Sequence, residues 1–94
     1  MKKIISALND IYQKTDVESS LYSAFGELLY SAVTPAVPFA LPAAEKFDEN
    51  VAQENGVTYL CVHRMTGIYY VALKGDGRES RNYAVMLDAV IGSG

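Results

Sequence analysis

Hydrophobic residues recur with a helical period near the start of the chain. From residue 4 to residue 12 they occupy positions i, i+1, i+4, i+7 and i+8, which lie on one face of a helix, and lysine, asparagine and aspartate side chains lie off this face. The apolar positions are Ile4, Ile5, Leu8, Ile11 and Tyr12. This pattern predicts a first, amphipathic helix.

A second helix is predicted directly after the first. Thr15 and Glu18 are separated by three positions, a spacing typical of a capping box, in which the threonine accepts a hydrogen bond from the N3 amide and the glutamate reaches back to the cap. The helix would run to about Val33 on a hydrophobic stripe of Val17, Leu21, Ala24, Phe25, Leu28, Leu29 and Ala32. Because the connection is short, we expect the two helices to form an antiparallel helical hairpin.

The next segment, Thr34–Leu41, is rich in proline. Pro35, Pro38 and Pro42 have no backbone N–H and bias the residues before them toward extended conformations. The segment is therefore predicted to be an irregular or polyproline-like crossing. Its apolar side chains, which we expect another part of the protein to cover, are Val37, Phe39 and Leu41.

Two β-strands are predicted at residues 57–64 and 68–74. Both are rich in valine, tyrosine and isoleucine, and the short loop between them contains a glycine, which together indicate a β-hairpin. In the first strand Tyr59, Cys61 and His63 share one face and the even-numbered residues share the other. The second strand is apolar on both faces, so both faces of the sheet need cover.

The last segment, residues 79–91, allows two interpretations. Asp76 and Glu79 have capping-box spacing, Gly92 stands where a helix often ends, and the apolar residues between them follow a period of 3.6. The alternative is a third antiparallel strand over residues 82–90. We favour the helix because of its length and its flanking caps, and its apolar positions are Tyr83, Met86, Leu87, Val90 and Ile91.

These elements predict an α+β protein. We expect an N-terminal helical hairpin packed on a small antiparallel sheet, the hairpin 57–64/68–74, closed by a C-terminal helix. A chain of 94 residues has room for one hydrophobic core, so a single domain over residues 1–94 is expected.

Charge and cysteine content narrow the function classes. Eleven acidic residues against eight basic ones give a net charge of −3, which argues against a nucleic-acid-binding protein that works by neutralising phosphates. The longest uncharged run, Leu28–Ala44, contains three prolines and is too short for a membrane helix. A single cysteine cannot form an internal disulfide. We therefore expect a cytoplasmic protein that contacts neither membrane nor nucleic acid.

Much of the negative charge lies between residues 43 and 54. Glu45, Asp48 and Glu49 have helical spacing and would lie on one face of a weakly predicted helix. The simpler interpretation is a solvated face, because polar residues surround them. The alternative is an acidic surface that steers a basic partner.

Cys61 and His63 are the only pairing of a nucleophile with an imidazole that lies close together in the sequence. Positions i and i+2 of a strand face the same way, but a direct hydrogen bond would require the two side chains to lean together. Two potential ligands are too few for a zinc or iron site. We expect no catalytic site, no metal and no cofactor.

Tyrosines suggest surfaces for a partner. Tyr22, Gly26 and Tyr30 would fall on one line of the predicted second helix and form a shallow groove, or the tyrosines would pack under the hairpin. Tyr70 lies on the strand that is apolar on both faces, where a homodimer could provide the missing cover. We expect these residues and the acidic cluster to bind a protein partner.

The function expected from these observations is a non-catalytic protein-binding module. One form of it is a small intracellular inhibitor, such as an immunity protein, an antitoxin or a phage anti-defence protein, that occludes a functional surface of its partner. A first alternative is a subunit of a homo- or hetero-oligomeric assembly. A second is a small-molecule binder or minimal enzyme that uses Cys61 and His63.

Overall fold

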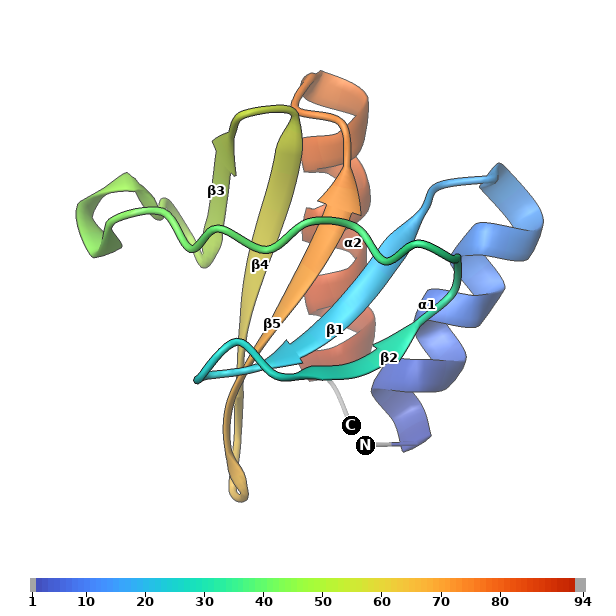
Figure 1. The fold of residues 1–94 in the computed structure, drawn as a ribbon, viewed down its shortest axis with the longest axis horizontal. Coiled ribbons are helices and arrows are strands. Elements are labelled where there is room, and N and C mark those ends of the chain that lie inside the picture. Colours follow the sequence, from blue (N-terminus) through green and yellow to red (C-terminus); the bar gives the residue numbers. More distant parts are fainter. Residues whose placement is uncertain (1, 93–94) are drawn as a thin grey trace.

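A computed structural model describes residues 2–92 and confirms the α+β class, with one helix from each end of the chain on an antiparallel sheet (Figure 1). The proline-rich residues 32–43 pass over the other face of the sheet. We call this segment the crossing, and the sheet face beneath it the crossing face. The elements are α1 (Lys2–Thr15), β1 (Ser19–Ser23), β2 (Leu28–Ser31), the 3-10 helix η1 (Ala44–Lys46), β3 (Val51–Glu54), β4 (Val57–Arg64), β5 (Gly67–Lys74) and α2 (Arg78–Gly92).

The sheet has five antiparallel strands in the order β2-β1-β5-β4-β3. The predicted hairpin is confirmed, because β4 pairs with β5 along its whole length, from Val57 opposite Lys74 to Arg64 opposite Gly67. On its other side β5 pairs with β1, so the last strand of the chain lies beside the first. This central position explains why β5 is apolar on both faces.

The predicted second helix is wrong, because residues 19–31 form the hairpin of β1 and β2. Thr15 does not begin a helix; its hydroxyl donates to the Ile11 carbonyl at 2.5 Å and accepts from the Val17 amide, and α1 ends there. Asp16 then takes a positive φ of 60°, which directs the chain into β1. β1 is covered on both faces, so its residues lack the apolar–polar alternation that marks a half-buried strand. The apolar residues from Val17 to Ala32 recur at intervals of three and four positions, and this spacing resembled a helix.

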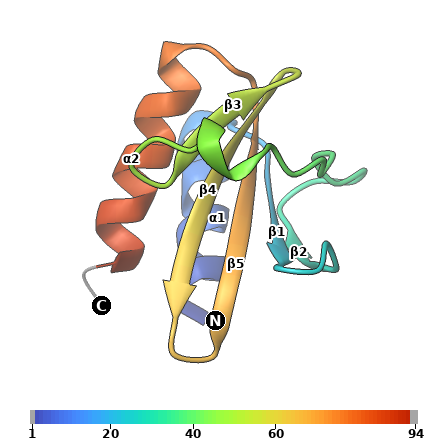
Figure 2. The same ribbon diagram turned by 90° about the vertical axis from the view of Figure 1, so that its left-hand side faces the viewer.

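The main core lies between the sheet and the two helices, as Figure 2 shows from the side. Leu60, Val71 and Leu73 of the central strands are fully buried against Ile4 and Leu8 of α1 and against α2. The predicted apolar stripe of the first helix is therefore confirmed as its sheet-facing side. The buried residues of this core are Ile4, Leu8, Leu21, Val51, Leu60, Val62, Val71, Leu73, Ala84, Leu87 and Ile91.

The crossing supplies the cover that the other sheet face needs. Val37 is 3% exposed and packs with Tyr22, Tyr59 and Ala72 in a second cluster on this face, and Phe39 adds a partly buried ring. The expectation that both sheet faces are covered is thus confirmed. Figure 2 shows that the cover comes from the chain itself, with the helices on one side of the sheet and the crossing on the other.

The C-terminal segment is helical, as we favoured, and the alternative of a third strand is wrong. Asp76 does not cap this helix; its carboxylate accepts a hydrogen bond from the Gly56 amide at 3.0 Å and ties the β3–β4 turn to the loop before α2. Neither α1 nor α2, the two α-helices among residues 2–92, is long and apolar enough to cross a membrane.

Candidate functional site

The crossing is fastened to the sheet by side-chain hydroxyls. Tyr22 Oη donates to the Val37 carbonyl at 2.5 Å, and the Val37 amide donates to Ser20 Oγ at 2.9 Å. Further along, the Ala40 amide donates to Tyr59 Oη at 3.0 Å. Because prolines have no N–H, a strand-like ladder cannot hold this segment, and hydroxyls from β1 and β4 take that role. These hydrogen bonds therefore fix the position of the crossing over the sheet.

Aromatic rings complete this attachment. The Phe39 ring stacks on Tyr22 with centroids 4.6 Å apart, and it meets Tyr59 edge-on at 5.9 Å and Tyr70 at 5.8 Å. Burial raises the pKa of the Tyr22 hydroxyl, and the neighbouring Tyr59 raises it further. The hydroxyl therefore stays protonated and keeps donating to Val37.

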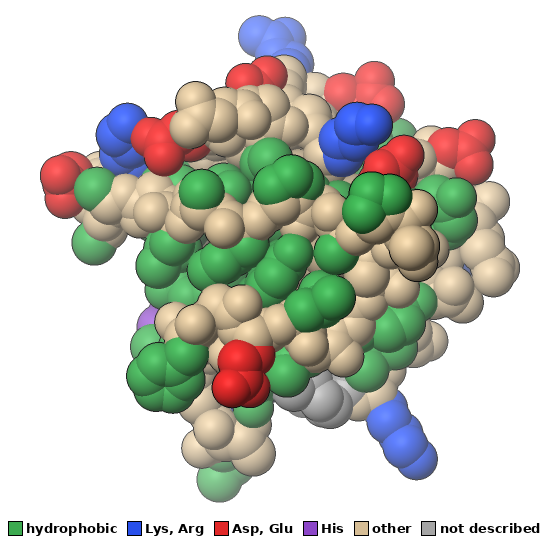
Figure 3. Space-filling model, in the orientation of Figure 1, with side chains coloured by type: hydrophobic (Ala, Val, Ile, Leu, Met, Phe, Trp, Pro, Cys, Tyr) green, Lys and Arg blue, Asp and Glu red, His purple; other side chains and the backbone are tan. Residues whose placement is uncertain are grey.

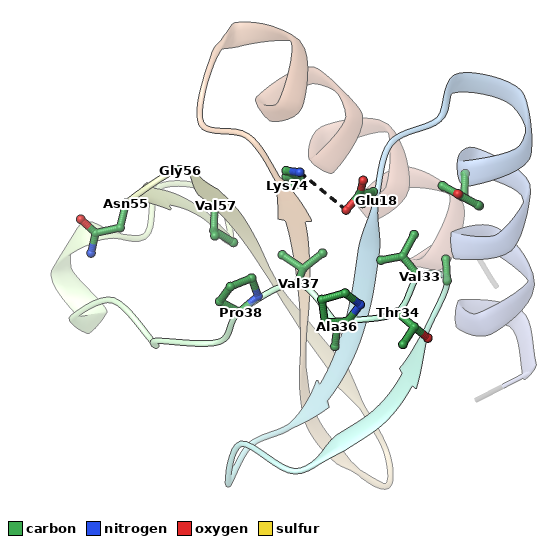
Figure 4. Close-up of a pocket in the computed structure, with 13 residues that line it drawn as sticks. Glu18, Val33, Thr34, Ala36, Val37, Pro38, Asn55, Gly56, Val57 and Lys74 are labelled. Atoms are coloured by element: carbon green, nitrogen blue, oxygen red, sulfur yellow. Dashed lines mark ion pairs between the residues drawn. The ribbon is translucent and has the colours of Figure 1, made fainter.

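A groove of about 820 Å³ opens on one side of the crossing (Figure 4). Its walls are the crossing, the end of α1 and the β3–β4 turn, and two oppositely charged residues, Glu18 and Lys74, line it. Figure 4 shows their side chains directed toward each other, with Val33 and Val37 beside them on the crossing. The remaining lining residues are apolar or uncharged: Tyr12, Ala32, Thr34, Pro35, Ala36, Pro38, Asn55, Gly56 and Val57.

The sheet determines where these two charges lie. The Lys74 amide donates to the Glu18 carbonyl at 3.0 Å, which extends the pairing of β1 with β5 by one residue. Val57 pairs with Lys74 on the other side, so the three residues form one row at the end of the sheet, on the crossing face. The ion pair itself is long, at 3.9 Å between Lys74 Nζ and Glu18 Oε1, and both side chains are solvent-accessible.

A second cluster surrounds the cysteine. Cys61 Sγ lies 3.5 Å from His63 Nε2, so the two side chains do lean together on the strand. Burial raises the pKa of the Cys61 thiol, a hydrogen bond with Tyr70 partly lowers it, and Asp88 raises it. Burial also raises the pKa of Tyr70, as does the adjacent thiol. This environment favours a neutral thiol, whereas a nucleophilic cysteine needs a lowered pKa.

Cys61 and Tyr70 border a hollow of about 230 Å³ under the end of the crossing. Its other lining residues are Leu41, Pro42, Ala44, Phe47 and Asn50. Around it, large hydrophobic side chains reach the solvent. We define the apolar surface as Phe25, Leu28, Leu41 and Ile68, which are 94%, 52%, 44% and 41% exposed.

Strand register and packing place all four residues on the crossing face. A register shift between Leu21 and Tyr22 interrupts the alternation of β2, so Leu28 pairs with Tyr22 and points to this side of the sheet although Tyr30 does not. Ile68 stands two residues from Tyr70 on β5 and points to the same side. A Cβ added at Gly26, next to Phe25, would lie 3.5 Å from the Phe39 ring, which places the β1–β2 turn against the crossing. Figure 3 shows hydrophobic side chains gathered over the middle of this face, with acidic ones mainly toward its margins.

The predicted line of Tyr22, Gly26 and Tyr30 does not exist, because these residues are not on a helix. Tyr22 is 7% exposed under the crossing, and Gly26 lies in the β1–β2 turn with a φ of 85°. Tyr30 pairs with Leu21 and packs against the helix-side core, on the opposite face from Tyr22. The alternative, that the tyrosines pack under the hairpin, is right in that Tyr22 is buried, but the crossing covers Tyr22 and the hairpin lies beside it in the sheet. Tyr70 is half-buried on the crossing face.

The acidic residues do not share a helical face either. The helix in this region is the three-residue η1, which includes Glu45, and Asp48 and Glu49 lie in the loop before β3. Asp48 forms a 3.5 Å ion pair with Arg81 of α2, and Glu49 has a positive φ of 50°. All three acidic side chains are nonetheless exposed. Residues 2–92 hold no group of three or more His, Cys, Asp and Glu side chains placed to bind a metal ion.

Sequence reasoning missed two features of this face. Phe25 was assigned to the core of a helix, although the Ser23 and Gly26 that flank it are typical of a turn. Glu18 and Lys74 were not connected, because 56 positions separate them and only the β1–β5 pairing joins them. An alternating pattern in Ser19–Ser23 would have revealed that pairing, but the strand is covered on both faces.

Comparison of the chain with protein-family models, with curated proteins and with solved structures gives no match in any of the three.

Proposed function

We propose that the protein is a non-catalytic binding module that docks its apolar surface onto another protein and thereby blocks a functional surface of that partner. The observation that carries this proposal is Phe25, whose side chain is 94% exposed at the tip of the β1–β2 turn. Leaving a phenylalanine in water forgoes about 1.5–3 kcal/mol of hydrophobic stabilisation, so such a residue is a candidate anchor for a partner.

The turn that carries Phe25 is held in one shape. Ser23 Oγ accepts from the Phe25 amide and from the Glu27 amide, both at 3.2 Å, and the Ser23 amide donates to the Glu27 carbonyl at 2.9 Å. Gly26 supplies the positive φ that the turn requires. A pre-organised anchor loses little conformational entropy on binding, which is what a binding module needs.

The charges around the apolar surface indicate the chemistry of the partner. Glu27 stands beside the Phe25 turn, and the exposed Glu45 and Glu49 flank the hollow lined by Ala44 and Asn50. An apolar patch with acidic residues at its margin complements an apolar pocket with a basic margin. Such charges raise the association rate and fix the orientation of the partner more than they add affinity.

The experiment is affinity capture from cells of the source organism with wild-type protein, Phe25→Ser and Val85→Ser. Val85 is a matched control, because it is also an exposed hydrophobic side chain, 48% exposed, but lies on α2 at the other face. We expect a partner that binds wild type and Val85→Ser alike and that binds Phe25→Ser at least about tenfold more weakly.

With the partner purified, raising the salt concentration should slow association while leaving dissociation nearly unchanged. The proposal is wrong if every protein captured by wild type is captured equally by Phe25→Ser. It is also wrong if the two substitutions weaken capture to the same extent, because the loss would then not be specific to the crossing face.

The alternative of a homo-oligomeric subunit uses the same surface. In sedimentation equilibrium a wild-type dimer that becomes monomeric with Phe25→Ser, but not with Val85→Ser, would favour this alternative over a heterologous partner. A concentration-independent monomer mass would remove it.

A further inference from the structure

We propose that the groove between the crossing and the row Glu18–Lys74–Val57 binds a free α-amino acid with an apolar side chain, held as its zwitterion. This site is separate from the apolar surface and does not depend on the proposed function. In it the ligand ammonium would contact Glu18 Oε1, the ligand carboxylate would contact Lys74 Nζ, and the side chain would lie against the valines of the crossing.

The first argument is the charge arrangement. Of the residues that line the groove, Glu18 and Lys74 are the two that carry charge, and their charges are opposite. An α-amino acid carries the complementary pair of charges on groups attached to one carbon. At 3.9 Å the Glu18 carboxylate and the Lys74 ammonium are too far apart for a short hydrogen bond. A ligand can therefore pair with each of these two groups without breaking a strong contact between them.

The second argument is that the charges are pre-positioned. Backbone pairing fixes Glu18 and Lys74 side by side on the crossing face, and the crossing faces them from the other wall. Lys74 remains 69% exposed and Glu18 39% exposed, so both are accessible to a ligand that enters from solvent. Groups already aligned by the sheet need little reorganisation to bind.

The third argument concerns the rest of the groove. Val33, Val37 and Val57 form an apolar part of the groove wall beside the two charges, and Thr34 and Asn55 form a polar part. Pro35 and Pro38 contribute apolar rings and no N–H donors. A volume of about 820 Å³ lies within the range of small-molecule sites and has room for an aromatic side chain.

The test is an NMR titration of the ¹⁵N-labelled full chain with L-phenylalanine as the probe. We expect saturable shifts of the amides of Val33, Val37 and Val57. Two analogues each lack one charge: phenylalaninamide has no carboxylate, and 3-phenylpropionate has no ammonium. Because each charge-assisted contact is lost separately, we expect each analogue to bind at least about tenfold more weakly than phenylalanine.

Variants then assign each charge to its partner. Glu18→Gln should weaken phenylalanine binding about tenfold but leave the binding of 3-phenylpropionate unaffected. Lys74→Met should likewise weaken phenylalanine binding about tenfold but leave the binding of phenylalaninamide unaffected. Lys46→Met is the matched control, because Lys46 belongs to a different surface ion pair, with Glu54, and should leave binding unchanged. The analogues are measured on wild type, so their result does not depend on how well a variant folds.

Three results would overturn the proposal: no saturable shift with phenylalanine, equal affinity for the two analogues and phenylalanine, or an equal loss in Lys46→Met. In any of these cases Glu18 and Lys74 form an ordinary surface ion pair. Because Phe25→Ser leaves the groove intact, it should bind phenylalanine like wild type. Failure of the partner-capture experiment is therefore distinguishable from failure of this one.

Discussion

The Tyr22 hydroxyl should be the strongest single attachment of the crossing to the sheet. Tyr22→Phe removes the donor to the Val37 carbonyl and keeps the ring that stacks on Phe39. Val37 is 3% exposed, so water cannot readily replace the lost donor, and the carbonyl is left buried and unpaired. An unpaired buried acceptor costs about 1–3 kcal/mol, which is a large part of the 5–15 kcal/mol that stabilises a typical domain.

Urea denaturation followed by circular dichroism measures this cost. For a small protein a loss of that size lowers the urea midpoint by about 1 M without changing the slope of the transition. Tyr69→Phe is the matched control: its hydroxyl bonds to Thr66 at an exposed position, and its loss should cost less than about 0.5 kcal/mol. If Tyr22→Phe is no more destabilising than Tyr69→Phe, the hydroxyl does not hold the crossing and the reasoning is refuted.

The double variant Tyr22→Phe with Tyr59→Phe extends this test. Tyr59 accepts a hydrogen bond from the Ala40 amide, so the two hydroxyls hold the same segment at two places. If the crossing detaches as one unit once it is loosened, the double variant will be less destabilised than the sum of the single variants. Strict additivity would show instead that the two attachments are independent.

Three further predictions concern other groups. The pKa of Tyr22 is raised in the folded protein above its ordinary value of 10.0, so the unfolded chain releases this proton first as the pH rises. The contribution of Tyr22 to stability should therefore be complete below about pH 10 and should be lost as the pH rises through the folded pKa. Urea midpoints measured against pH should fall less in Tyr22→Phe than in wild type, and an equal fall would contradict this prediction. The Cys61 thiol, whose pKa is raised, should react with iodoacetamide more slowly at neutral pH than free cysteine does. His63→Ala should leave this rate unchanged, whereas a marked slowing of the reaction in His63→Ala would support a catalytic pair of Cys61 and His63. Gly26→Ala should cost about 1–2 kcal/mol in thermal unfolding, because its φ of 85° strains any residue with a Cβ, and a neutral result would show that the Phe25 turn is not held rigidly.

The ends of the chain and the β4–β5 hairpin were predictable because their signals are local. The stripe of Ile4, Leu8 and Ile11 has only one buried side, so its period is visible in the sequence, and the same holds for α2. In the hairpin, a short loop between two valine- and tyrosine-rich runs determines the pairing without help from the rest of the chain.

The candidate site was less predictable than the fold class. The irregular conformation of the proline-rich crossing and its need for cover followed from its composition, but the residues that hold it, Tyr22 and Tyr59, come from two different strands. The exposure of Phe25 depended on the β1–β2 turn, which the helix prediction concealed. Apolar residues spaced at i, i+3 and i+4 indicated a helix over residues 17–32. This indication was misleading because β1 is buried on both faces and shows no apolar–polar alternation.

By itself the sequence determined the α+β class, the first helix, the long hairpin and the need to cover both faces of β5, and it favoured a C-terminal helix over a third strand. Tertiary structure alone decided that residues 19–31 form a β-hairpin, because the pairing of β1 with β5 on one side and with β2 on the other satisfies the backbone of β1. The crossing and the helices then bury both faces of β1. It also decided which residues meet at the groove. Glu18 and Lys74 are distant in sequence, and the backbone hydrogen bond between them is the physical reason that their charges lie side by side.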